Sequence, residues 1–345
     1  MSHCAVVLGK ESSVSIFQLW ARSCLLAFAG AMVTLTVPSL VHAQGAYPAR
    51  TVTFIWPFAA GNPSGEAFRV YAEETGKILG RPMITDFRGG AGGRLGLQAV
   101  MAAPPDGYLV AAALDASFSA IPLMSDSFKP ELGRDYSPVI APVDSAPVLT
   151  SHPSLPFRDV RGLIAHVKAN PGKLNFGSAG VGSWTHLALE VFLDAAGGLN
   201  MVHIPYKGGA SAIADRLSGR VSLYISGADV ASMVNSGQLI GLAVIHPKRL
   251  ASLPNMPTLA EAGLPQASLR QWMGIIAPSG TPQEVVARLN VAFNAALKVP
   301  AVVKAMEAGG WIINPDTSPD DFTRLVRSDI ATWSPIVRRT GLKID

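Results

Sequence analysis

From residue 51 onward, short runs of β-branched and aromatic residues alternate with longer segments whose apolar residues recur at helical spacing. Residues 51–56 and 83–87 are of the first kind, and residues 66–79 are of the second. The same pattern predicts further strands at 108–114, 201–204, 221–225, 240–245 and 272–277, and further helices at 95–102, 160–169, 210–217, 283–297 and 320–340. Strand–helix alternation of this kind is typical of an α/β protein with parallel layers.

A glycine-rich segment at residues 175–186 (NFGSAGVGSWTH) lies between a predicted strand and a helix-like run. Such a junction directs several unpaired backbone N–H groups at one spot, where the helix dipole favours negative charge. Ser183 is the predicted N-cap, and Ser178 supplies a second hydroxyl. The spacing of the glycines fits neither common nucleotide-binding motif, and neither serine has the G-x-S-x-G setting of a nucleophile. The segment is therefore a tight turn or an anion site without attached chemistry, and the second interpretation suggests a carboxylate-binding protein.

The first 43 residues have the pattern of a cleavable signal peptide. Lys10 and Arg22 flank an apolar run at 24–37, and the residues that end at Ala43 resemble a signal-peptidase site. We therefore expect export and cleavage after Ala43, with a retained membrane anchor as the alternative, although the run is short for a membrane span. The only two cysteines, at positions 4 and 24, lie inside this leader, so the mature chain has none, which suits an oxidising periplasm.

Composition narrows the class of protein further. The chain of 345 residues has a net charge of +4, and removal of the leader, with two basic residues and one acidic one, leaves +3. No basic cluster suggests a nucleic acid partner, and the scattered histidines have no metal-ligand spacing, so no cofactor or metal is expected. About 300 mature residues are enough for two domains of ordinary size.

Several short motifs follow one another along the whole mature chain. They are PFAAG at 57–61, RGGAGG at 88–93, PDGY at 105–108, NPGKLNFGS at 170–178, PYKGG at 205–209, PTLAEAG at 257–263 and APSGTP at 277–282. Taken together they resemble the Bug (TctC-like) extracytoplasmic solute receptors. The resemblance implies a two-lobed periplasmic binding protein fold of type II-like architecture, with mixed sheets flanked by helices and a ligand cleft between the lobes. The first lobe comprises 44–150 and the return segment 269–345, and the second lobe comprises 151–268.

In such receptors, backbone amides and hydroxyls of loops from both lobes hold a ligand carboxylate. The resemblance implies a monomer that delivers its ligand to a membrane transporter of the tripartite tricarboxylate type, or that serves as the ligand-sensing partner of a sensor kinase. It implies no catalytic residue. The ligand-binding residues carried over to this chain are Phe58, Ala60, Gly61, Asn62, Ser117, Ser178, Gly180, Gly182, Ser183, Trp184, His186, Tyr206, Lys207 and Gly208.

Alternatives remain for single residues. Ser183 and His186 lie three apart on one helical turn, which suits capping better than the catalytic triad of a serine hydrolase. His186 is either a donor to the carboxylate or a structural histidine, and Lys207 is either an attracting charge or a solvated loop lysine. Gly65 stands where the family usually has an aspartate, and Trp184 offers an apolar face; together they favour a carboxylate whose remainder is apolar or aromatic.

Overall fold

The computed structural model describes residues 47–344 except 62, 91–92, 208 and 228–229. The predicted signal peptide with its cleavage site after Ala43, and the predicted site residues Asn62 and Gly208, lie outside the described residues. In the described part of the chain, no single helix is long and apolar enough to cross a membrane; one pair, bent by 80°, passes by length and composition only. That pair consists of α10 (Gln283–Ala296) and α11 (Pro300–Ala308).

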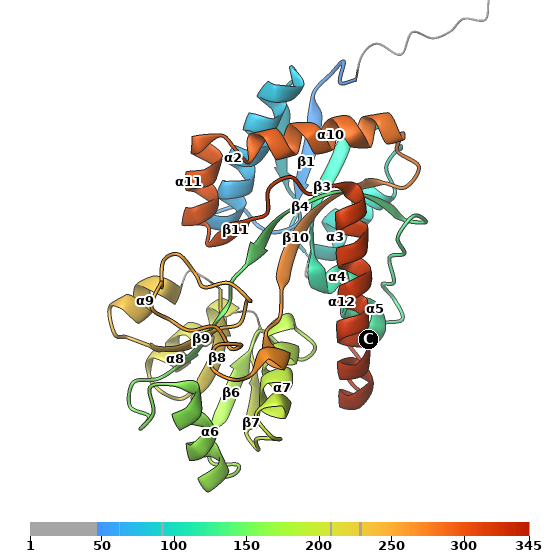
Figure 1. Cartoon of the computed structure of the whole chain (residues 1–345). Coiled ribbons are helices and arrows are strands. Elements are labelled where there is room, and N and C mark those ends of the chain that lie inside the picture. The colour runs from blue at the N-terminus through green and yellow to red at the C-terminus, as the bar shows by residue number, and fades with distance from the viewer. Residues whose placement is uncertain (1–46, 62, 91–92, 208, 228–229, 345) are drawn as a thin grey trace, which may run out of the picture. The chain divides into compact units, whose positions relative to one another are not determined.

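The first of two sheets has six strands in the order β11-β4-β10-β3-β1-β2 (Figure 1). Their bounds are β1 Val52–Trp56, β2 Met83–Phe87, β3 Leu109–Leu114, β4 Tyr136–Ser145, β10 Gln271–Pro278 and β11 Trp311–Ile313. β1 runs parallel to β2 and β3, whereas β10 runs antiparallel to β3 and β4. The sheet is therefore mixed, which confirms the mixed sheets that the family resemblance implied. Strand–helix alternation accounts only for the parallel pairs, because β4 leads the chain towards the second sheet and β10 brings it back.

Helices cover both faces of this sheet. α2 (Pro63–Leu79), α10 and α11 share one core, to which they contribute Phe68, Phe293 and Met306. The other core contains Leu97 of α3 (Arg94–Met101) and Phe118 of the short helix α4 (Asp115–Phe118), which is followed by α5 (Ile121–Met124). β1 and β3 are parallel, so the loops that follow them lie at the same edge of the sheet.

The second sheet has five strands in the order β7-β6-β8-β5-β9. Their bounds are β5 Val148–Ser151, β6 Asn175–Ser178, β7 Val202–Pro205, β8 Leu223–Ser226 and β9 Ile240–Val244. α6 (Val160–Ala169) and α7 (Trp184–Ala195) contribute Leu163 and Phe192 to its core. The shorter elements are η2 Gly209–Ala212, α8 Ile213–Leu217, α9 Ala231–Asn235 and η4 Pro265–Ala267. β6 is parallel to β7 and β8, while β5 is antiparallel to both of its neighbours.

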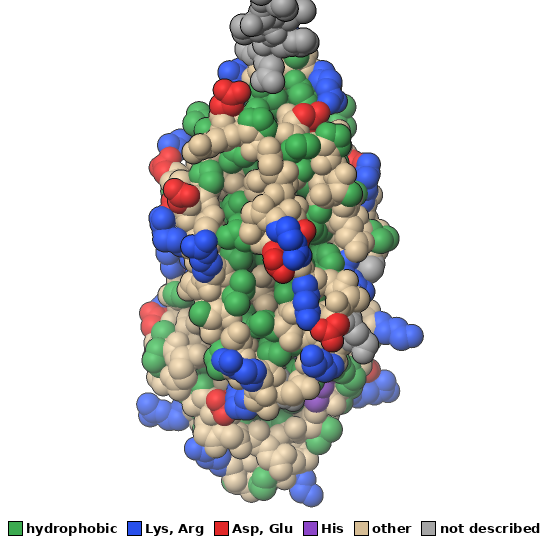
Figure 2. All heavy atoms as spheres, turned by 90° about the vertical axis from the view of Figure 1, so that its right-hand side faces the viewer, with side chains coloured by type: hydrophobic (Ala, Val, Ile, Leu, Met, Phe, Trp, Pro, Cys, Tyr) green, Lys and Arg blue, Asp and Glu red, His purple; other side chains and the backbone are tan. Residues whose placement is uncertain are grey.

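The last helix, α12 (Pro319–Thr340), contacts the cores of both sheets (Figure 1). Phe322 packs with the first sheet, and Trp333 packs in the core cluster of the second. Near its end, Arg339 forms an ion pair of 2.7 Å with Asp194 of α7. The predicted lobe boundaries near residues 150 and 268 stay a prediction, and α12 belongs by its contacts to both lobes. On the face drawn in Figure 2, basic, acidic and apolar side chains are interspersed.

Candidate ligand-binding site

The segment between β6 and α7 has the structure that its sequence predicts. Ser183 is the N-cap of α7, and its Oγ accepts a hydrogen bond of 3.3 Å from the backbone N–H of His186. Gly180 and Gly182 have φ angles of 130° and 74°, a region that favours glycine over any residue with a side chain. The glycines therefore allow the chain to turn sharply between the strand and the helix.

Several of the predicted donors in this loop are used within the loop itself. The N–H of Gly180 donates to Ser178 Oγ at 3.1 Å, and the N–H of Gly182 donates to His186 Nδ1 at 3.1 Å. The Ser178 side chain is fully buried, and its Oγ lies 2.7 Å from Nε2 of His203. The Ser178 hydroxyl and the Gly182 amide thus already have partners within the protein, and their predicted ligand roles stay predictions.

Other amides of the loop remain available. Within the described residues, the backbone N–H groups of Val181, Trp184 and Thr185 have no hydrogen-bond acceptor. Trp184 and Thr185 are the first two residues of α7, where the helix dipole favours an anion. Thr185 was missed by the sequence analysis; its Oγ1 accepts from the N–H of Ala179 at 3.0 Å and so holds the loop against the helix. The start of α7 thus presents two adjacent donors without partners.

His186 has a structural role in the described contacts. Its ring stacks on that of His203, with centroids 3.9 Å apart, and His203 stacks in turn on Phe176. Burial, with a contribution from His203, lowers the pKa of His186 to about 4. The ring is therefore neutral near pH 7, and because Nδ1 accepts from Gly182, Nε2 carries the proton. That Nε2 lies 3.8 Å from Oε1 of Glu190, beyond hydrogen-bonding distance.

Trp184 points into the protein. Its side chain is 6% exposed and packs in one core cluster with Met124 and Trp333. Its indole lies near the carboxyl of Asp115, the residue after β3, but outside hydrogen-bond geometry. The apolar face that the ligand prediction assigned to Trp184 is thus turned into protein, and a preference for an apolar ligand loses this support. Gly65, its other basis, lies within α2.

The remaining predicted residues fall into two groups. Tyr206 adjoins the β6–α7 loop, since its N–H donates to Ser178 O at 3.0 Å; its hydroxyl donates to Asp215 at 2.8 Å. Lys207 is exposed, as expected for a solvated lysine. In the first lobe, Phe58 packs against Trp56, Ala60 and Gly61 are exposed, and Ser117 is buried in α4. Through Asp115 and Trp184 the structure brings the end of β3 to the start of α7.

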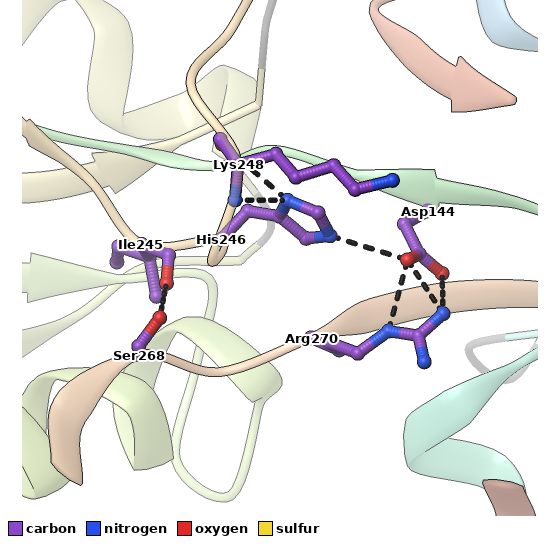
Figure 3. Close-up of polar contacts among 6 residues, drawn as sticks. All are labelled: Asp144, Ile245, His246, Lys248, Ser268 and Arg270. Atoms are coloured by element: carbon purple, nitrogen blue, oxygen red, sulfur yellow. Dashed lines mark hydrogen bonds and ion pairs between the residues drawn. The ribbon is translucent and has the colours of Figure 1, made fainter. Parts of the chain in front are cut away.

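A network of three charged or polar side chains ties the segments that pass between the sheets (Figure 3). Asp144, near the end of β4, accepts hydrogen bonds from Arg270 at 2.6 and 2.9 Å and from Nε2 of His246 at 3.1 Å. His246 follows β9, and Arg270 directly precedes β10. Asp144 and His246 are almost completely buried. The network therefore joins the two segments in which the chain passes from one sheet to the other. Among the described residues, neither this network nor any other group of three or more His, Cys, Asp or Glu side chains could hold a metal ion.

Comparison with known proteins places this geometry in a family. The family model of the tripartite tricarboxylate transporter family receptor, TctC, matches residues 67–342. The chain belongs to this family. Its members are periplasmic solute-binding receptors, and the fold is accordingly the two-lobed periplasmic binding protein fold.

Individual relatives agree with this assignment. Protein BugT of Bordetella pertussis is 33% identical over 324 residues, which cover 93% of this chain and 98% of BugT. The structure of R. palustris Rpa4515 with adipate has a TM-score of 0.74 at 30% identity and covers 86% of this chain and 99% of its own. The structure of MatC from Rhodopseudomonas palustris with bound malate has a TM-score of 0.71 at 26% identity, with coverage of 84% and 100%.

Proposed function

We propose that this chain is a receptor that captures a small carboxylate between its two lobes and delivers it to a transporter of the tripartite tricarboxylate type. The observation that carries the proposal is the pair of backbone N–H groups at Trp184 and Thr185 that have no acceptor among the described residues at the start of α7. A helix N-terminus with free amides is suited to a carboxylate. The adipate and malate bound to two relatives are both dicarboxylates, and they support this class of ligand.

A serine hydrolase has less support. Ser178 Oγ and His203 Nε2 are 2.7 Å apart, a separation found between a nucleophile and its base. The Ser178 side chain is fully buried, however, and its Oγ also donates to the carbonyl of Gly180 and accepts from the N–H of Gly180. Ser183 Oγ contacts the backbone N–H of His186, and the imidazole of His186 is bound to Gly182. These contacts favour a binding site held rigid by its hydroxyls over a catalytic one.

The receptor acts in the periplasm after its signal peptide is removed. The apolar run at 24–37 and the small-residue site before Gln44 support export and cleavage after Ala43. Mass spectrometry of a periplasmic extract tests this directly. A mature N-terminus at Gln44 is expected, and a product that retains residues 24–37 contradicts it.

A thermal-shift screen tests the ligand class. A ligand that binds only the folded receptor raises its melting temperature. Mono-, di- and tricarboxylates, including aromatic ones, are compared with the corresponding amides at equal concentration. We expect at least one carboxylate to raise the melting temperature while its amide does not. Deletion of the gene then separates the two receptor roles: loss of ligand uptake supports transport, and a lost transcriptional response with normal uptake supports the sensing alternative.

A further inference from the structure

Two carboxyl groups are buried close to the start of α7, and the proposed function does not use either of them. Asp115 follows β3 and is completely buried, and Asp329, on α12, is 9% exposed. Oδ1 of Asp115 accepts from the N–H of Ala116 at 2.6 Å. Oδ2 of each aspartate has no hydrogen-bond partner among the described residues. Buried carboxylates without partners are costly, and a proton on such a group removes most of that cost.

The surroundings of the pair determine which of the two holds a proton more tightly. Burial, and then the nearness of Asp329, raises the pKa of Asp115 well above its ordinary value; Asp144 of β4 adds to the effect, while the N–H of Ala116 and the indole of Trp184 oppose it. Burial raises the pKa of Asp329 to about 6, against the opposing effects of Ser119, two indoles and Arg270. The two indoles belong to Trp272 and Trp333. Within the described part of the chain no ion pair involves Asp115, while the nearby Asp144 is already bound to Arg270 and His246.

The cover over Asp115 comes in part from the second lobe. Trp184 is the first residue of α7, and its indole lies near the Asp115 carboxyl. Trp184 is buried in one core cluster with Ala120 and Met124, which follow α4 in the sequence, and with Trp333 of α12. Separation of the lobes would take Trp184 away from Asp115 and admit water to the carboxyl. Lobe closure would therefore change the solvent around Asp115 more than around residues buried within one lobe.

We propose that Asp115 and Asp329 form a proton-binding site whose occupancy is coupled to ligand capture, so that the receptor takes up a proton from solvent when its lobes close on a carboxylate. The proton is held on the carboxyl pair, beside the amides of Trp184 and Thr185 that face the ligand. Trp184 thus joins both events, because its backbone N–H is offered to the ligand and its side chain covers the proton site. This inference rests on the proposed function, since it needs a ligand that closes the lobes.

The direction of the pH effect follows from linkage. In this structure burial outweighs the opposing effects of Ala116 and Trp184 and raises the pKa of Asp115, so access of water to the carboxyl on opening would lower that pKa towards its ordinary value. Between these two values the closed state binds more protons than the open one, so affinity is highest at low pH. Affinity then falls as pH rises towards the closed-state value, by up to about tenfold per pH unit for one proton.

Calorimetric titration of the mature receptor with adipate measures the proton directly. The titration is run between about pH 6.5 and about pH 8.5, where carboxylates of ordinary pKa are ionised. Phosphate and Tris differ in ionisation enthalpy, so the difference in binding heat between them gives the number of protons taken up. We expect net proton uptake and an affinity that decreases with pH. Binding without proton exchange and without pH dependence overturns the inference but leaves the proposed function intact, whereas failure of every carboxylate in the screen to bind overturns both.

Two variants assign the proton to this pair. Asp115→Asn places a neutral group of the same size in the site, so the fall in affinity with pH should shrink or vanish. Asp126→Asn is the matched control, because its carboxyl is on the surface with 78% of the side chain exposed; it should keep the wild-type pH dependence. If Asp115→Asn fails to fold, Asp329→Asn serves in its place, and it should likewise weaken the fall in affinity with pH. If the folded aspartate variants keep the wild-type pH dependence and proton uptake, the proton binds elsewhere and the inference is wrong.

Discussion

The imidazole rings of His186 and His203 lie face to face, with centroids 3.9 Å apart and planes inclined by 9°. His186 belongs to α7 and His203 to β7, so the stack links α7 to the edge strand of the second sheet. Both pKa values are lowered, chiefly by burial, and the rings stay neutral near pH 7. The neutral Nδ1 of His186 then accepts the N–H of Gly182 and holds the loop in place.

This relationship predicts acid sensitivity. The pKa of His186 is about 4 in the folded protein against an ordinary 6.5, so the unfolded chain binds a proton more readily between these values. The stabilising contribution is complete above about pH 6.5 and is lost as pH falls through about 4, by roughly 2–3 kcal/mol. His186→Asn retains an acceptor near the position of Nδ1 but cannot be protonated. Urea unfolding from pH 7 to pH 4 should show a smaller acid loss in this variant than in the wild type; equal losses argue against the assignment.

The Asp144 network predicts a stability effect at the crossing between lobes. Asp144→Asn removes the charge that binds Arg270 and His246, and we expect a loss of about 1–3 kcal/mol in the free energy of unfolding. The effect is moderated because 41% of the Arg270 side chain is exposed and can be solvated. Asp316→Asn is the control, since its ion pair with Lys298 is on the surface, and its cost should stay within about 0.5 kcal/mol. Similar losses in both variants contradict a special role for Asp144.

A pair of substitutions at Trp184 isolates its backbone N–H. Proline is tolerated at the first position of a helix, and Ser183 before it has φ −66° and ψ 157°, a conformation compatible with a following proline. Trp184→Pro and Trp184→Ala both remove the indole, but only the proline variant lacks the N–H. After circular dichroism confirms that both fold, the proline variant should bind its carboxylate about tenfold more weakly than the alanine variant, the effect of one lost hydrogen bond to a charged group. Equal affinities show that the ligand does not use this amide.

Local signals were sufficient for several elements of the fold. α6 has the predicted bounds because Asp159 caps its start and Pro171 follows its end. β4 was missed because Pro138 and Pro142 interrupt its apolar pattern, and proline disfavours an interior strand. The structure accommodates these prolines where the pairing of β4 with β10 shifts register. Such tolerance depends on the partner strand, which comes from a distant part of the sequence.

In the candidate site, too, the features set by local sequence were predictable, and those set by distant residues were not. The glycine-rich loop and its Ser183 cap follow from local sequence, and the structure confirms both. The internal use of the Gly182 amide depends on the rotamer of His186, which burial and the stack on His203 determine. The contact between Asp115 and Trp184 joins the two lobes, and nothing in either local sequence indicates it.

The most direct test of the central claim is calorimetric titration of the mature receptor with a dicarboxylate and with its diamide. Adipate and adipamide share a carbon skeleton, as do malate and its diamide, so each comparison isolates the ionised carboxylate. We predict saturable binding at one site for at least one of the two acids and no measurable heat for the matching amide. Equal binding of an acid and its amide would contradict recognition of a carboxylate at the start of α7.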